Sequence, residues 1–308
     1  MFWAFLAGIG ACTNAAYFIV NKRFLERVDP NVLAATGFLC TSLFLFILAL
    51  INGIPVAGPG FLVAALVTTV LNILGTTLTF RALSSSDISL SIPMLSFTPL
   101  FLIVTAAVFL GEMPSVVGVL GILIIVSGSY ILNTAAEHEG ILDPFRDMIA
   151  HPGVMAMLTV AFLYSIAINF DKMVVVTTDQ FFGPAIVFLM LGSSFAILAL
   201  LARGKCLPAW SLPPPHPVRD AGCGAPPASY GYIIGAAVVV GVLITLEAVS
   251  INSAYLLQIV PYVIAIKRMS LILIVLYGTI VFREKELVRR LSGAGLMVLG
   301  AVLILAFP

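Results

Sequence analysis

The sequence predicts an all-α integral membrane protein with ten transmembrane helices, arranged as two inverted five-helix repeats. Three observations predict this fold class. Of the 308 residues, 61% are hydrophobic and only 9% are charged, whereas soluble domains carry about 25% charged residues. Apolar runs long enough to cross a bilayer recur along the whole chain. A pattern of glutamate and glycine in the first half also returns in the second half.

Ten apolar segments approach the roughly 20 residues that a helix needs to cross the hydrocarbon core of a bilayer. They cover residues 2–20, 32–51, 61–80, 88–110, 116–132, 154–176, 181–201, 232–257, 259–282 and 291–307. Most connections between them are short and contain glycine, proline and charged residues. We therefore expect consecutive helices to be antiparallel neighbours.

Two connections are longer. Residues 134–152 place apolar side chains at helical spacing between charged ones, which predicts a short amphipathic linker helix at the membrane interface. Residues 203–229 are rich in proline and predict an irregular exposed loop that holds Cys206 and Cys223. These cysteines either pair, if the loop faces an oxidising compartment, or are two unrelated thiols.

The internal repeat divides the chain into residues 1–133, the linker 134–152 and residues 153–308. Each half carries a glutamate followed by glycines nine and sixteen residues later: Glu112, Gly121 and Gly128, then Glu284, Gly293 and Gly300. Because five helices are an odd number, the second unit enters the membrane in the opposite orientation. Inverted repeats are typical of transporters with a midplane substrate site. We interpret the glycines as packing positions, since small residues let membrane helices approach closely.

In its motifs the chain resembles the ten-helix EamA-like members of the drug/metabolite transporter superfamily. The resemblance covers essentially the whole chain. It rests on Ser91-Ile92-Pro93, Thr98-Pro99-Leu100-Phe101, Leu110-Gly111-Glu112, Ala265-Ile266-Lys267-Arg268 and Phe282-Arg283-Glu284-Lys285, together with the four repeat glycines. It implies a secondary transporter that moves a small polar metabolite by alternating access around a central cavity. The cargoes of the superfamily range from amino acids to nucleotide sugars, so membership does not choose the substrate.

Charged residues inside apolar segments mark the candidate substrate site, because each costs at least ~2.5–3.5 kcal/mol on insertion scales. Lys267 and Arg268 lie in the ninth segment, and Glu247 is the only carboxylate that we expect deep in a span. Adjacent helical residues point about 100° apart, so we expect one cation to face the cavity and the other to reach a neighbouring helix or Glu247. Either the pair binds an anionic group of the substrate, or it forms a structural ion pair with Glu247.

The resemblance favours the substrate-binding alternative. The branch of the superfamily that carries triose phosphates and nucleotide sugars has a similar Lys-Arg pair on its ninth helix, where it contacts phosphate. The first half has no matching basic pair, so the site should be electrically lopsided. We therefore expect an anionic or zwitterionic cargo, such as an amino acid, an organic acid or a sugar phosphate.

Two further charged residues have alternative interpretations. Glu247 either neutralises the basic pair or takes up a proton as the coupling ion, since burial and a nearby cation act on a carboxyl in opposite directions. Lys172 lies near the end of the sixth segment and is either a lysine that snorkels to the headgroups or a ligand of the substrate.

Polar and proline residues complete the predicted site. Tyr262 and Asn169 in the second half, with Tyr17 and Asn14 on the first helix, are candidate hydrogen-bonding groups for the substrate, although polar residues in spans also join helices. We expect the prolines of the fourth and ninth segments to kink those helices. These are Pro93, Pro99 and Pro261.

Other classes of function lack sequence support. A net charge of +1 gives no sign of a nucleic-acid partner, and no catalytic or nucleotide-binding motif is present, so we expect neither an enzyme nor a cofactor. The four cysteines form no metal-binding pair. The expected partners are the lipid bilayer and a small-molecule substrate, with the protein a monomer or a homodimer. The alternatives are a non-transporting receptor or scaffold, and a flippase of a lipid-linked sugar.

The orientation in the membrane has two conflicting indications. Twelve basic residues lie in or beside the odd-numbered connections, and Lys172 alone lies towards the other side. The positive-inside rule therefore favours termini outside the cell, whereas the resemblance implies cytoplasmic termini. In a prokaryote the membrane would be the cytoplasmic membrane.

Overall fold

The computed structural model describes residues 1–308 except 26, 86–91, 134–151, 203–228, 283–286 and 308. The described residues form helices and no strand. In order the helices are α1 (Phe2–Leu25), α2 (Pro30–Asn52), α3 (Phe61–Ser85), the 3₁₀ helix η1 (Ile92–Phe97), α5 (Thr98–Leu110), α6 (Val116–Asn133), α8 (Pro152–Thr177), α9 (Phe182–Ala202), α10 (Tyr230–Tyr255), α11 (Val260–Lys267), α12 (Ser270–Phe282) and α13 (Leu287–Ala306). Nearly all of the predicted amphipathic linker, together with Cys206 and Cys223, lies outside the described residues.

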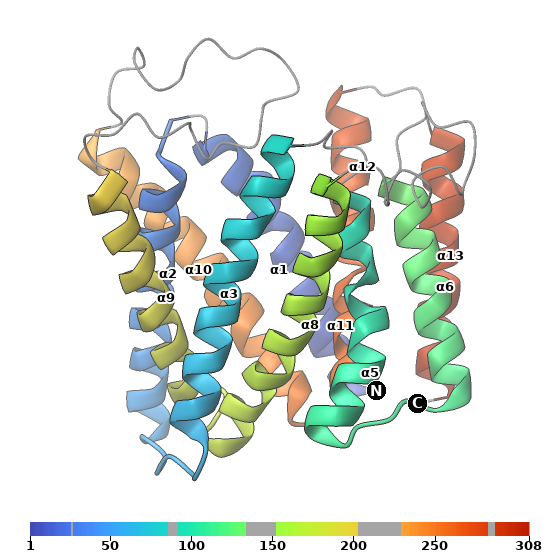
Figure 1. Cartoon of the computed structure of the whole chain (residues 1–308), viewed down its shortest axis with the longest axis horizontal. Helices are drawn as coiled ribbons and strands as arrows, with labels where there is room; N and C mark the ends of the chain where they lie inside the picture. The colour runs from blue at the N-terminus through green and yellow to red at the C-terminus, as the bar shows by residue number, and fades with distance from the viewer. Residues whose placement is uncertain (26, 86–91, 134–151, 203–228, 283–286, 308) are drawn as a thin grey trace.

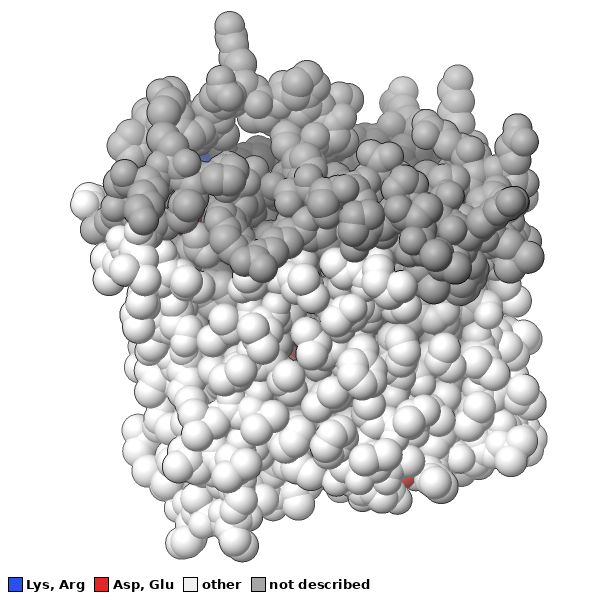
Figure 2. Space-filling model, in the orientation of Figure 1, with Lys and Arg blue, Asp and Glu red and all other residues white. Residues whose placement is uncertain are grey.

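The helices confirm the predicted class of integral membrane protein. Within the described residues, seven helical stretches are long and apolar enough to cross a membrane, and shorter apolar helices cover 94–110, 116–132 and 291–306. Together they account for all ten predicted segments. The outer surface is correspondingly apolar: Leu43, Leu66 and Val108 are all exposed, and uncharged residues dominate the described part of the face in Figure 2.

The helices stand side by side in one bundle, with both chain termini at the same end (Figure 1). The most extensive packing joins helices from different halves of the sequence. It pairs α6 with α13, α3 with α8, α2 with α9, and α1 with α10. The two halves therefore share one core. This pairing has the two-fold pattern that an inverted repeat would produce.

Both the fourth and the ninth span are divided into two helical pieces. The fourth consists of η1 and α5, and the ninth of α11 and α12. Helix α5 runs from 98 to 110 and α12 from 270 to 282, so both bounds differ by 172 residues. The same offset separates Glu112 from Glu284 in the sequence. The two breaks thus lie at equivalent places, which supports the predicted repeat.

The expectation that these prolines kink their spans agrees with the break between η1 and α5, which lies at Pro99, but it is wrong for Pro261, which lies at the start of the ninth span. Each lies in the first turn of its helix, α5 or α11, where the missing N–H needs no intrahelical partner. The ninth span is instead interrupted after Lys267. There the backbone N–H of Met269 donates to the carbonyl of Ile266 at 2.9 Å, a tight bond to the third preceding residue.

The repeat glycines lie at the contact between α6 and α13. A Cβ atom added to Gly121 would lie 2.9 Å from the carbonyl oxygen of Gly300, and one added to Gly300 would lie 2.5 Å from that of Gly121. Gly128 and Gly293 form the same reciprocal contact, at 2.6 and 2.8 Å. These glycines therefore allow the two backbones to touch, as their interpretation as packing positions requires.

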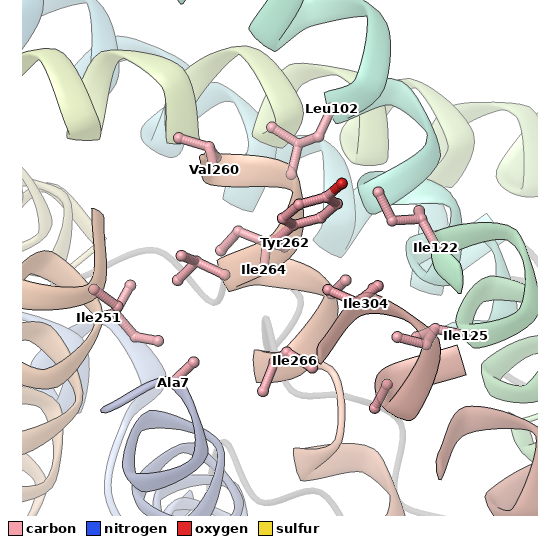
Figure 3. Packing of buried hydrophobic residues seen from close by; sticks show 14 of the residues in the cluster. Ala7, Leu102, Ile122, Ile125, Ile251, Val260, Tyr262, Ile264, Ile266 and Ile304 are labelled. Atoms are coloured by element: carbon pink, nitrogen blue, oxygen red, sulfur yellow. The ribbon is translucent and has the colours of Figure 1, made fainter. Parts of the chain in front are cut away.

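Helix α11 lies at the centre of the largest apolar cluster. Its residues from Val260 to Ile266 are all buried and pack against side chains from α1, α5, α6, α10 and α13. Figure 3 shows Tyr262 surrounded by apolar residues of this cluster, with Leu102 and Ile122 among them. This packing fixes α11 and so positions Lys267 and Arg268, which follow directly at its end.

Candidate functional site

Lys267 is joined to the helices α1 and α10 by a chain of polar contacts. Its Nζ lies 2.6 Å from Oε1 of Glu247 on α10, and the same oxygen accepts a hydrogen bond of 3.0 Å from Nδ2 of Asn14 on α1. The side chain of Lys267 is 28% exposed and that of Glu247 13%. The ion pair is thus partly buried, and it holds three helices together at the end of α11.

Arg268 follows Lys267 in the chain, and its surroundings differ from those of Lys267. In the described part of the chain its guanidinium forms no ion pair and no side-chain hydrogen bond. Arg268 is partly buried and lies between the end of α11 and the start of α12. The expectation that Lys267 and Arg268 differ in their surroundings agrees with this arrangement, with Lys267 as the residue that reaches Glu247.

A second carboxylate, Asp171, lies within a span. Oδ1 of Asp171 on α8 accepts a hydrogen bond of 2.5 Å from the hydroxyl of Thr68 on α3, and Nδ2 of Asn72 donates to the same hydroxyl at 3.1 Å. Asp171 also interacts electrostatically with Lys267. Asp171 lies six residues before the end of α8, whereas Glu247 lies further inside its own helix, α10.

The two carboxylates occupy related interfaces. Glu247 connects α10 to α1, and Asp171 connects α8 to α3. In an inverted repeat these two helix pairs are counterparts of each other. Each interface thus contains one acid that is hydrogen-bonded to a polar residue of the other half.

Tyr17 and Tyr255 complete a polar cluster that we define as Asn14, Tyr17, Asp171, Glu247, Tyr255 and Lys267, to which we add Arg268 as the residue that follows Lys267 in the chain. Tyr17 interacts electrostatically with Glu247 and Tyr164. Tyr255, which is 4% exposed, interacts with Asp171, Glu247 and Glu112. Tyr255 is not among the site residues that the sequence predicts. A tyrosine near a helix end gives no signal of its own until the fold shows which charges surround it.

Lys172 belongs to a second network, which joins α8 to Glu112 and to the start of α11. Its Nζ forms an ion pair with Oε1 of Glu112 and donates to the carbonyl of Gln258 at 2.9 Å. The other carboxylate oxygen of Glu112 accepts a hydrogen bond of 2.7 Å from the backbone N–H of Val260, in the first turn of α11. Lys172 and Glu112 are only 12% and 14% exposed. Lys172 thus pairs inside the protein, and the alternative of snorkelling to the headgroups is wrong.

Asn169 and Tyr262 are placed away from the charged cluster. Asn169 is fully buried and donates to the hydroxyl of Thr105 on α5 at 3.0 Å and to the carbonyl of Ser165 at 2.8 Å. Tyr262 is 1% exposed, and its hydroxyl contacts Ser115, whose backbone N–H donates to it at 2.9 Å. Both residues connect helices. Of the predicted site residues, the fold brings together Lys267, Glu247, Asn14 and Tyr17, and Arg268 is the next residue of the chain after Lys267.

The described residues contain no group of three or more His, Cys, Asp or Glu side chains that could hold a metal ion. What the polar cluster can do follows from its charges. Among the described residues it offers Arg268, a cation without an ion-pair partner, Lys267, a cation paired with Glu247, and Asp171, an acid whose hydrogen-bond donor is a neutral hydroxyl. Such a set can bind a polar ligand and exchange a proton.

Comparisons with known proteins show a likeness to one family in the first half of the chain. Residues 1–134 match the EamA-like transporter family, which confirms the resemblance that the motifs of this region indicated. No curated protein matches the chain. One solved crystal structure, among 28 matching chains, has a TM-score of 0.75 and 16% sequence identity, and the match covers 99% of both chains. At that identity the likeness shows the fold alone. The family indicates a membrane transporter of the drug/metabolite type.

Proposed function

We propose that this integral membrane protein, whose residues 1–134 match the EamA-like transporter family, is a secondary transporter of a small polar metabolite with an anionic group. The cargo is an anionic or zwitterionic compound, and it binds at the polar cluster. Transport proceeds by alternating access of this cluster to the two sides of the membrane. Arg268 is the residue that holds the anionic group.

The interruption of the ninth span beside two cations is the observation that carries this proposal. In a bilayer, irregular backbone is tolerated only where it is buried in protein or lines a water-filled cavity. Transporters use discontinuous helices of this kind to form substrate sites near the midplane, between their repeats. Here the break follows Lys267 and contains Arg268, so a charged group lies where a substrate site is expected.

The charges on either side of the break favour an anionic group in the cargo. Lys267 is matched by Glu247, whereas Arg268 has no acidic partner among the described residues. A guanidinium offers a planar fork of N–H donors that suits carboxylate or phosphate. A bound anion would supply the compensation that the fold does not supply. Asp171 could receive an amino group, which keeps zwitterionic cargo within the proposal.

Counterflow in proteoliposomes tests the proposed function. The purified protein is reconstituted, the vesicles are loaded with one unlabelled compound, and uptake of its labelled form is followed. The panel contains amino acids, phosphorylated sugars and lipophilic cations. We expect exchange of at least one anionic or zwitterionic compound. Exchange of lipophilic cations alone would contradict the proposed cargo, and absence of exchange with the whole panel would favour a receptor or scaffold.

A further inference from the structure

We propose that Asp171 is the site that binds and releases the coupling proton, while Glu247 stays ionised as the partner of Lys267. The proposal rests on the proposed transport function and identifies the ion to which transport is coupled. It differs from the expectation drawn from sequence, in which Glu247 was the candidate proton carrier.

The two acids of the polar cluster outnumber the lysines beside them. Two carboxylates of the polar cluster, Glu247 and Asp171, lie near one lysine. Lys267 contacts Glu247 at 2.6 Å, and Asn14 donates a further hydrogen bond to the same oxygen. Asp171 has no cation within ion-pair distance among the described residues. Its contact partner is the neutral hydroxyl of Thr68. Glu247 is therefore compensated, and Asp171 needs another source of positive charge.

A proton is the simplest compensation for a carboxylate in this position. An ionised carboxylate within a membrane span is costly unless it is paired or solvated. Asp171 lies six residues before the end of α8 and is partly buried, beside the fully buried Thr68. Binding one proton at Oδ1 or Oδ2 removes the charge, and release of that proton restores it.

Thr68 can serve both states of Asp171. A hydroxyl is both a donor and an acceptor of hydrogen bonds. It donates to the ionised carboxylate at 2.5 Å, and it can accept from the protonated acid after rotation about its C–O bond. Asn72 already donates to the same hydroxyl at 3.1 Å and holds its position. Glu247 is held by two N–H donors, Asn14 and Lys267, which suit the ionised form.

The helices that pack against α8 present few charged or titratable side chains near Asp171. Helices α3, α5, α9 and η1 present none among their described side chains. Helix α10 contributes Tyr255 and Glu247, α11 contributes Lys267, α8 itself contributes Tyr164 and Lys172, and Glu112 follows α5. Lys172 and Glu112 neutralise each other in their own ion pair. Lys267 is therefore the cation whose position depends on whether Asp171 is charged.

The response of Lys267 to the charge of Asp171 connects proton binding with the break in the ninth span. When Asp171 is protonated, Glu247 is the acid that attracts Lys267 among the residues that the structure describes. When Asp171 releases its proton to the aqueous phase, Lys267 is drawn towards two acids on different helices, α8 and α10. Lys267 is the last residue of α11, directly before Arg268. Loading and release of the proton would thus change the electrostatic force on the backbone beside the proposed substrate site.

Infrared difference spectroscopy of the purified full chain in lipid nanodiscs tests this assignment without any substrate. The C=O stretch of a protonated carboxyl is recorded while the pH is lowered from alkaline to acidic values. We expect a band that appears on acidification, is lost in Asp171→Asn and remains in Glu247→Gln. A band that survives in Asp171→Asn, or that disappears only in Glu247→Gln, would overturn the proposal.

Matched variants and salts sharpen the test. Asp171→Glu keeps a carboxyl and should keep a shifted band, which separates loss of the group from loss of the fold. Thr68→Val should shift the pH at which the band appears, whereas Thr76→Val should not, although Thr76 contacts Tyr164 on the same pair of helices. Removal of the band by sodium at constant pH would show a sodium site instead and overturn the proton assignment. Because the readout needs no transport, absence of counterflow would refute the transport proposal independently.

Discussion

Lys267 and Arg268 are adjacent in the chain, yet their charges meet different surroundings. Lys267 has Glu247 at 2.6 Å, and Arg268 has no acidic partner in the described part of the chain. The sequence predicted this division from the angle between adjacent helical residues. It could not predict which residue would reach Glu247, because that depends on where α11 ends relative to α10.

The ion pair of Lys267 and Glu247 predicts a specific pattern of stability. Glu247→Gln leaves the ammonium without its anion, so we expect a loss of about 1–3 kcal/mol, less than a fully buried pair would lose because Lys267 is partly exposed. Removing both charges in Lys267→Met/Glu247→Gln should recover most of that loss. Thermal unfolding in detergent measures both effects. A double variant that is less stable than both single variants would contradict this interpretation.

Glu112 supports a second prediction, because its two oxygens have different partners. One pairs with Lys172, and the other accepts from the backbone N–H of Val260. The exchange Glu112→Lys/Lys172→Glu reverses the ion pair, but a lysine at 112 cannot accept a hydrogen bond. We expect the exchanged protein to unfold at a lower temperature than the wild type. Full recovery of the melting temperature would show that the contact with α11 contributes nothing.

At the scale of elements, the apolar pattern predicted all ten spans but not their interruptions. Hydropathy indicates only whether a residue can lie in lipid. Residues 259–282 are apolar enough to be predicted as one continuous helix. The structure instead places a two-residue turn, 268–269, between α11 and α12, and α11 is buried from Val260 to Ile266. The predicted kink at Pro261 is absent for a related reason. A proline in the first turn of a helix and one in its interior look alike in a sequence.

The contact between α6 and α13 gives a prediction with an internal control. A Cβ at position 300 would lie 2.5 Å from the carbonyl oxygen of Gly121, whereas one at position 295 on the same helix meets nothing within 4 Å. Gly300→Ala should therefore destabilise the protein by about 1–3 kcal/mol. Gly295→Ala should be neutral or stabilise it by up to about 1 kcal/mol, because alanine favours the helix. Equal melting temperatures for the two variants would argue against close packing here.

At the scale of the whole molecule, the repeat in the sequence anticipated how the halves meet. The offset of 172 residues relates the glycines, the glutamates and the bounds of α5 and α12. The candidate site was less predictable. Glu247 is a candidate because charged groups are rare in spans, and Asn14 and Tyr17 are candidates as polar residues of the first helix; the fold brings the three together. Asn169 and Tyr262 were chosen for the same reason, but they join helices elsewhere. Polarity in a span shows that a residue has a partner without showing which one.

The central claim is that a polar cargo with an anionic group is transported by way of Arg268. Its most direct test is the concentration dependence of counterflow for the best anionic or zwitterionic substrate in the wild type, Arg268→Gln, Arg268→Lys and Arg27→Gln. Arg27 is an exposed arginine whose guanidinium lies over the ring of Tyr232, so its variant controls for loss of a positive charge. We predict that Arg268→Gln raises KM roughly 10- to 100-fold, the cost of one charged hydrogen bond. The KM of Arg268→Lys should lie between those of the wild type and Arg268→Gln, and the KM of Arg27→Gln should equal that of the wild type. An unchanged KM in Arg268→Gln would contradict the account.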